Sequence, residues 1–176
     1  PIKSSAASDV YKRQVLSMIK KYQDSNVYYI LVTGDKNYAE VLELKKQAEK
    51  EIHKSLDEYL RLEKFIFNMD EMYKVADMCI TRSGAMTICE LALAHKPSVL
   101  IPLPYAAENH QFFNAKVLES VNAAKIIEQK DLTEDTLNSA VLDIISNNNI
   151  EKIGDNASRV IVKNVEEKIY SCIKAK

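Results

Sequence analysis

Short apolar runs alternate with longer amphipathic segments through most of this 176-residue sequence. The run at 27–32 is apolar, β-branched and aromatic throughout, which is typical of a strand buried on both faces. Further strands are predicted at 62–67, 78–81, 98–101 and 124–127, and helices at 15–22, 38–55, 69–75, 85–95, 108–121 and 133–146, with one or two more in 150–174. Thr133 is the expected cap of the helix at 133–146. Strands that alternate with helices predict an α/β fold, a doubly wound parallel sheet covered on both faces.

Length and composition exclude several classes of protein. A hydrophobic content of 47% in 176 residues suits one domain with a sizeable core. A formal net charge of −1 does not indicate the basic surface that binding to nucleic acid requires. The apolar runs are far shorter than the roughly 20 residues that span a bilayer, and an odd cysteine count on apolar elements suits a reducing compartment. We therefore expect a cytosolic protein.

The first fourteen residues differ from the rest of the chain. Residues 3–9 are small and polar and follow neither a strand nor a helix period, and residues 4–14 resemble a translated adapter sequence. We therefore expect a foreign segment at 1–14 and one domain at 15–176.

The segment 81–90 predicts a strand, a tight turn and the start of a helix. Ser83 can cap the helix through its hydroxyl, Gly84 lets a ligand approach the backbone, and the free amides of the first helical turn suit a phosphate. Glu90 lies further along the same helix, where its carboxylate is either an exposed polar group or an acceptor for vicinal hydroxyls of a ligand. An ordinary capped helix start is the competing interpretation.

Other polar residues gather near the same expected edge of the sheet. His110 and Gln111 open a helix after the run 98–104, where they either bind a sugar or begin a surface helix. Arg82 either reaches a diphosphate or solvates the turn. The lysines between 45 and 54 alternate with glutamates and predict a solvated helix face. No catalytic motif and no metal-ligand spacing is present in the sequence, so we expect neither a metal nor a cofactor.

Several segments together resemble the C-terminal half of the MurG family of peptidoglycan glycosyltransferases. They are Phe-Ile-Phe-Asn-Met at 65–69, Arg-Ser-Gly-Ala-Met-Thr-Ile-Cys-Glu-Leu at 82–91, Ile-Pro-Leu-Pro at 101–104 and Ala-Ala-Glu-Asn-His-Gln-Phe-Phe-Asn-Ala at 106–115. The resemblance extends from about residue 15 to the C-terminus. It implies a two-domain GT-B fold and transfer of N-acetylglucosamine from UDP-GlcNAc to lipid I, giving lipid II, at the cytoplasmic face of the cell membrane.

The resemblance also implies a role for individual residues in binding the donor. The backbone of Ile66 would meet the uracil, Glu90 would accept the ribose hydroxyls, and Gln111 with His110 beside it would contact the GlcNAc. The diphosphate would lie at the helix start, at the binding run formed by Ala85, Met86, Thr87, Ile88 and Cys89. No catalytic residue is assigned, because the family's acceptor site and proposed base belong to its N-terminal half.

This sequence departs from the family pattern in two ways. The N-terminal half is absent, and so are the first strand and glycine-rich turn of the C-terminal domain, which should precede residue 15. That strand is central in a doubly wound sheet, so its two neighbours would be left unpaired. We expect a marginally stable fragment that cannot complete the transfer alone. A separate donor-binding subunit that works with a membrane partner, and a non-catalytic UDP-sugar sensor, are the alternatives.

Overall fold

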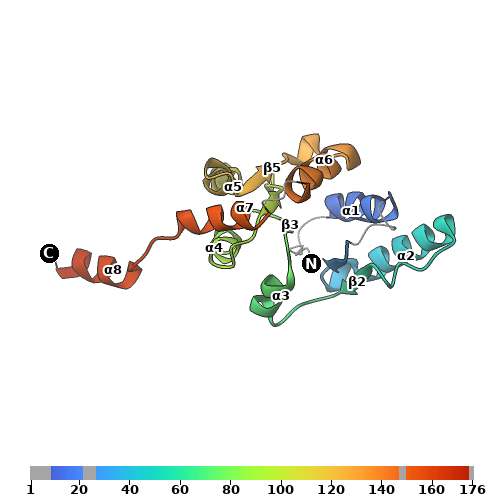
Figure 1. The fold of residues 1–176 in the computed structure, drawn as a ribbon, viewed down its shortest axis with the longest axis horizontal. Coiled ribbons are helices and arrows are strands. Elements are labelled where there is room, and N and C mark those ends of the chain that lie inside the picture. The colour runs from blue at the N-terminus through green and yellow to red at the C-terminus, as the bar shows by residue number, and fades with distance from the viewer. Residues whose placement is uncertain (1–8, 22–26, 147–149, 175–176) are drawn as a thin grey trace.

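The computed structural model of the protein describes residues 9–21, 27–146 and 150–174 (Figure 1). The first part contains α1 (Asp9–Lys21), β1 (Tyr29–Val32), α2 (Asp35–Ile52), β2 (Leu60–Glu63) and α3 (Met69–Val75). The middle contains β3 (Cys79–Thr81), α4 (Ala85–Leu93), β4 (Ser98–Leu100), η1 (Ala107–Asn109), α5 (His110–Ser120) and β5 (Ala124–Ile126). The last part contains η2 (Gln129–Asp131), α6 (Glu134–Ile145), α7 (Ile150–Ala157), η3 (Ser158–Val160) and α8 (Val165–Lys174). This alternation confirms the predicted α/β class.

The strands are parallel, and they form two sheets. β1 pairs with β2, with Tyr29 opposite Leu60, and β4 lies between β3 and β5. Within the described residues, β1 has no partner on its second side and neither does β3. From the sequence we expected two strands to be left unpaired, without naming them, and in the structure the described part of the sheet divides between β1 and β3.

Side chains that alternate along the strands supply two apolar clusters. Ile80, Val99 and Ile101 enter the first cluster, whereas Cys79 and Leu100 enter the second. Both faces of the three-stranded sheet are therefore buried, which explains why its strands read as continuous apolar runs rather than alternating ones.

Helix α1 connects the two halves of the first cluster. Its residues Val15, Leu16, Met18 and Ile19 are buried there with side chains from both sheets. The helix contacts both α2 and α6, and Figure 1 shows it between these elements. Within the described ranges no strand of one sheet pairs with a strand of the other, so this apolar packing holds the two sheets together.

Several predicted boundaries shift in the structure. α1 begins at Asp9, six residues before the expected start at residue 15, and residues 1–8 lie outside the described part. β2 ends at Glu63 rather than at residue 67, and Phe67 is 89% exposed beyond it. The apolar run at 62–67 is therefore only partly a buried strand. The predicted cap of α6 is confirmed, because Thr133 and Thr136 form a capping box.

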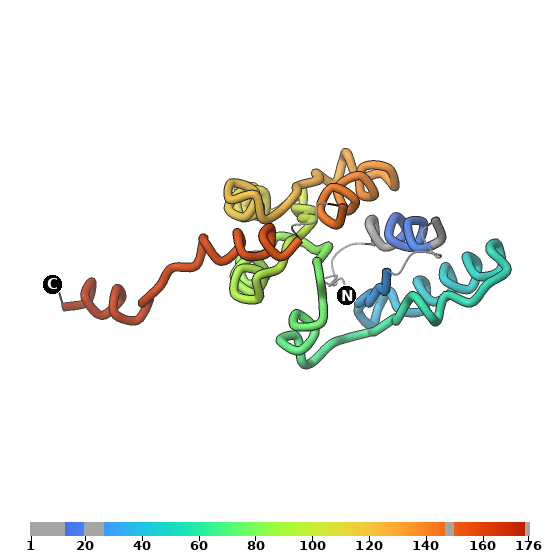
Figure 2. Tube along the Cα trace, viewed as in Figure 1, coloured from blue at the N-terminus to red at the C-terminus, as the bar shows by residue number. Residues whose placement is uncertain are grey.

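The C-terminal helix extends away from the rest of the molecule. Figures 1 and 2 show α8 beyond α7 at one end of the long axis, and none of its residues is buried. By contrast, α7 packs closely on the end of α4. A Cβ added at Gly154 would stand 2.3 Å from the carbonyl oxygen of His95, so this contact requires glycine.

Lys45 corrects the expectation of a fully solvated lysine face on α2. It is buried, and its Nζ lies 2.6 Å from Oδ1 of Asp57 and 2.9 Å from Oε1 of Glu49. Burial alone would lower the pKa of Lys45, but the hydrogen bonds and charges of Asp57 and Glu49 outweigh it and raise that pKa. The hydrogen bond from Lys45 also lowers the pKa of Asp57. Because Asp57 lies in the loop after α2 and Lys45 lies on the helix, their ion pair stabilises the packing of this loop against α2.

Replacement of the buried ammonium tests this role. Lys45→Met should lower the free energy of unfolding at pH 7, because Asp57 and Glu49 lose their common partner. Both carboxylates have lowered pKa values in the fold, so their contribution is present above the ordinary value near 4 and is lost as the pH falls through the lowered values. The difference between the variant and the wild type in urea unfolding should therefore shrink below about pH 4.

Lys46→Met is the matched control for that measurement. Lys46 is exposed on the same helix and is paired with Glu43 at 3.6 Å. Surface pairs of this kind contribute about 0–1 kcal/mol, so the control should remain close to the wild type at every pH. Equal effects of the two substitutions would contradict a special role for Lys45.

Candidate functional site

The turn between β3 and α4 is held in place by a buried arginine. Arg82 is 3% exposed, and its Nη1 donates to the carbonyl oxygens of Ile101 and Pro102, each at 3.0 Å. Its Nη2 donates to Oε1 of Gln129 at 2.7 Å. Both interpretations of Arg82 from the sequence are therefore wrong, since the side chain neither solvates the turn nor projects toward a ligand. It joins the carboxyl ends of β3 and β4 to the segment after β5.

Ser83 also has a different role from the predicted one. No side chain caps α4, and the N-cap position is Gly84. The Ser83 hydroxyl is buried and donates to the backbone carbonyl of Gln111 at 2.7 Å, while the amide of Asn114 donates to the Ser83 carbonyl at 3.1 Å. The prediction of a serine cap was wrong because the start of α5 lies close enough to take both bonds.

The N-terminus of α4 is consequently suited to an anion. The first intrahelical bond of the new helix runs from the Ile88 amide to the Gly84 carbonyl, so the amides of Ala85, Met86 and Thr87 precede the helical ladder. The first turn contains no acidic residue. Backbone N–H groups and the positive end of the helix dipole therefore meet at this turn.

Gly84 has no conformational need to be glycine. Its φ is −63°, an ordinary value, and an added Cβ would meet only the hydroxyl oxygen of Thr87 at 3.9 Å. The absent side chain leaves space in front of the helix start, which is where a ligand would approach the backbone.

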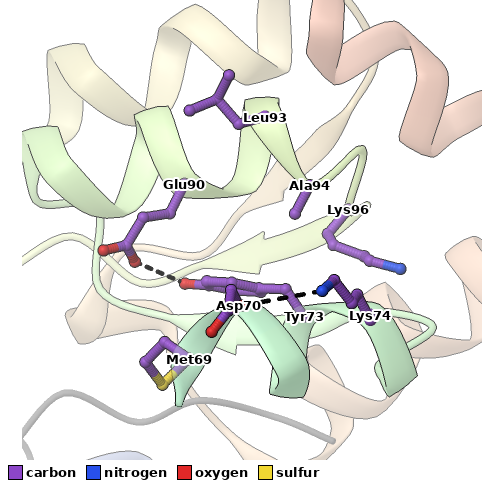
Figure 3. Close-up of a pocket in the computed structure, with 8 residues that line it drawn as sticks. All are labelled: Met69, Asp70, Tyr73, Lys74, Glu90, Leu93, Ala94 and Lys96. Carbon is purple, nitrogen blue, oxygen red and sulfur yellow. Dashed lines mark hydrogen bonds and ion pairs between the residues drawn. The ribbon is translucent and has the colours of Figure 1, made fainter. Parts of the chain in front are cut away.

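A groove runs between α3 and the part of α4 that follows its first turns. It has a volume of about 700 Å³ and is shown in Figure 3; its lining residues are Met69, Asp70, Tyr73, Lys74, Glu90, Leu93, Ala94 and Lys96. The Tyr73 hydroxyl donates to Oε2 of Glu90 at 2.8 Å across the groove. Burial, and then the bond to the Glu90 carboxylate, raise the pKa of Tyr73 well above its ordinary value, so the phenol keeps its proton. The Glu90 carboxylate therefore belongs to a built groove, which excludes a merely solvated position.

The predicted residues of the run 85–89 divide by exposure. Ala85, Met86 and Cys89 are exposed, with Met86 at 74%, and Thr87 is half-buried. Ile88 is buried in the second apolar cluster, and its amide is already bonded to Gly84. Ile88 can therefore contribute to binding only indirectly, by packing in the core beneath the turn.

The predicted residues outside α4 lie on neighbouring elements. Ile66 is half-buried between β2 and α3. His110 is exposed, and its Nδ1 lies 2.8 Å from the Ala107 carbonyl, so that nitrogen carries the hydrogen and Nε2 is the acceptor when the ring is neutral. Oε1 of Gln111 accepts a hydrogen bond from the Leu103 amide at 3.0 Å. The group of this side chain that could contact a sugar is therefore its amide nitrogen.

Sequence reasoning missed three residues that shape this site. Tyr73 was only part of a predicted short helix, Asn114 stood within the motif at 106–115 without a role, and Gln129 lies 47 residues from the arginine that it meets. The pairing of Tyr73 with Glu90 depends on how α3 packs on α4, which helix periodicity does not encode.

Comparison with known families decides what kind of domain this is. Residues 5–169 match the Glycosyltransferase family 28 C-terminal domain. The chain belongs to this family. Its fold agrees with that assignment, since the crystal structure of MurG from Acinetobacter baumannii has a TM-score of 0.78 at 23% identity, over 98% of this chain and 49% of that one.

Curated relatives of this family 28 domain share one name. The chain is 36% identical over 156 residues to a UDP-N-acetylglucosamine--N-acetylmuramyl-(pentapeptide) pyrophosphoryl-undecaprenol N-acetylglucosamine transferase of Thermoanaerobacter sp. strain X514, covering 88% of this chain and 42% of the relative. A Finegoldia magna protein of the same name is 34% identical over 175 residues, with 96% and 45% covered. The chain thus spans less than half the length of these relatives.

Among the described residues of the family 28 domain, no helix combines the length and the apolar character needed to cross a bilayer.

Two glycine substitutions separate the open turn of the family 28 domain from its packing. Gly84→Ala should change the free energy of unfolding by less than about 1 kcal/mol, because the new Cβ meets only a 3.9 Å contact and the poorer N-cap is offset by the lower entropy of the unfolded chain. It should weaken the binding of an anion at the start of α4, measured with pyrophosphate, at least tenfold, because the Cβ would occupy the approach to the amides. Isothermal calorimetry measures the affinity and urea unfolding measures the stability.

Gly154→Ala is the opposite case and serves as the control. Its Cβ would stand 2.3 Å from a backbone carbonyl, so the variant should lose about 1–3 kcal/mol of stability. The folded fraction should bind pyrophosphate as the wild type does. A loss of stability in Gly84→Ala comparable to that in Gly154→Ala would show that Gly84 is a packing glycine.

Proposed function

We propose that residues 15–176 form the donor-binding domain of an N-acetylglucosaminyltransferase whose donor is UDP-GlcNAc. One observation carries the proposal: the uncapped start of α4 lies at the carboxyl edge of the parallel sheet, directly after β3, and Glu90 on the same helix presents its carboxylate to the groove between α3 and α4. Nucleotides bind at this edge of open α/β sheets. The names of the curated relatives support the same donor.

The donor would span the site from the groove to the loop after β4. Its diphosphate would accept hydrogen bonds from the amides of Ala85, Met86 and Thr87, at the start of α4. Glu90 would accept the ribose hydroxyls, and the backbone of Ile66 would contact the uracil. His110 and the amide nitrogen of Gln111 would contact the GlcNAc.

The same geometry supports a role in the chemical step. Cleavage of the bond between the sugar and UDP leaves negative charge on the diphosphate. Aligned amides and the helix dipole at α4 stabilise that charge most in the transition state, which lowers the barrier. The chain's own contribution is therefore to bind the donor and to stabilise the leaving group.

The acceptor would be lipid I, as the resemblance to the MurG family implies. We propose that the acceptor site and the catalytic base come from the remaining half of the length found in the relatives, and that the longer protein meets its acceptor at the cytoplasmic face of the membrane. The described residues would then serve the donor alone.

Removal of the groove carboxylate tests the proposal. Glu90→Ala should weaken the binding of UDP by about 1–3 kcal/mol, the cost of losing charge-assisted hydrogen bonds to the ribose. Isothermal calorimetry on the wild type and the variant measures the difference. Glu167→Ala, which removes an exposed carboxylate from α8, should leave the affinity unchanged. An unchanged affinity in Glu90→Ala would remove this carboxylate from the site.

A further inference from the structure

Tyr73 is a buried hydroxyl donor that no part of the proposed function uses. Its side chain is 5% exposed, and its ring belongs to the second apolar cluster with Ile88 and Leu91. The hydroxyl emerges from this cluster at the groove and donates to Glu90 Oε2 at 2.8 Å (Figure 3). A donor on a fixed aromatic ring therefore meets the carboxylate at a fixed point.

The orientation of the Glu90 carboxylate depends on such a contact more than that of a shorter side chain would. A glutamate has three side-chain torsions, and Glu90 is only half-buried on α4. Without a partner, its carboxylate would sample several rotamers and would lose that freedom whenever a ligand bound. A hydrogen bond made before the ligand arrives restricts the carboxylate in advance.

The position of α3 gives the contact a second consequence. Tyr73 lies one turn after Met69, the first residue of α3, and this helix follows the segment that contains Ile66. The bond between Tyr73 and Glu90 therefore joins α3, the helix that follows the segment proposed for the base, to the carboxylate proposed for the ribose.

We propose that Tyr73 is a positioning residue that holds the Glu90 carboxylate in the orientation that selects a ribose diol over a deoxygenated sugar. This inference rests on the proposed function, because it assumes that a uridine nucleotide occupies the groove. The phenol does not touch the ligand in this account. It acts through Glu90, so its effect is confined to ligands that carry the hydroxyls.

The test compares UDP with its 2′,3′-dideoxy analogue in the full chain. The wild type should bind UDP more tightly than the analogue. Tyr73→Phe, which keeps the ring and removes only the hydroxyl, should weaken the binding of UDP roughly tenfold and leave the binding of the analogue unchanged. Glu90→Ala should abolish the preference, and Tyr73→Phe added to Glu90→Ala should change nothing more.

Tyr59→Phe is the matched control. Tyr59 also carries a hydrogen-bonded phenol, which accepts from Lys54 Nζ at 3.0 Å, and it does not line the groove. This variant should bind both ligands as the wild type does. Urea unfolding of Tyr73→Phe reports any loss of stability separately from the ligand preference.

The possible failures can be told apart. A wild type that binds no UDP overturns the proposed function, and this inference with it. A wild type that needs Glu90 for its preference, combined with a Tyr73→Phe variant that keeps the full preference, overturns the positioning role alone. Equal weakening of both ligands by Tyr73→Phe also overturns it, because a general distortion of the groove would not distinguish the two sugars.

Discussion

The buried guanidinium of Arg82 is the interaction on which the site depends. It reaches two carbonyl groups after β4 and the side chain of Gln129 after β5, so three strand ends of one sheet share a single donor group. Ser83 and Asn114 add bonds from the same turn to α5. Because these contacts use protein groups only, the turn is formed before any ligand arrives, which is what a binding site needs for high affinity.

The two sheets depend on apolar packing instead of hydrogen bonds. β1 and β3 each lack a second partner within the described residues, and the buried face of α1 fills the first cluster between the sheets. Apolar packing of this kind is not directional, whereas a shared strand would fix the register of both sheets. The groove and the α4 turn lie beside the three-stranded sheet, in which β3, β4 and β5 are hydrogen-bonded to one another.

Much of the fold was predictable because local pattern determines it. Continuous apolar runs gave the strands, and the bounds of α3 and the cap of α6 were predicted from composition and turn chemistry. The turn and Glu90 could be proposed together because they belong to one helix, and their role as a site stays a prediction. Roles that depend on distant partners were not predictable. Arg82, Ser83 and Lys45 each look exposed in the sequence, and each is buried against residues 12 to 47 positions away.

The central claim is that a uridine diphosphate lies across the start of α4 and the Glu90 groove. Titration of UDP into isotopically labelled protein, followed through backbone amide chemical shifts, tests it most directly. The largest changes are expected at Ala85, Met86 and Thr87, with further changes at Ile66 and Glu90. Saturating UDP that leaves the amides of 85–87 unshifted, or that shifts only the depression beside Lys50 and His53, would contradict the account.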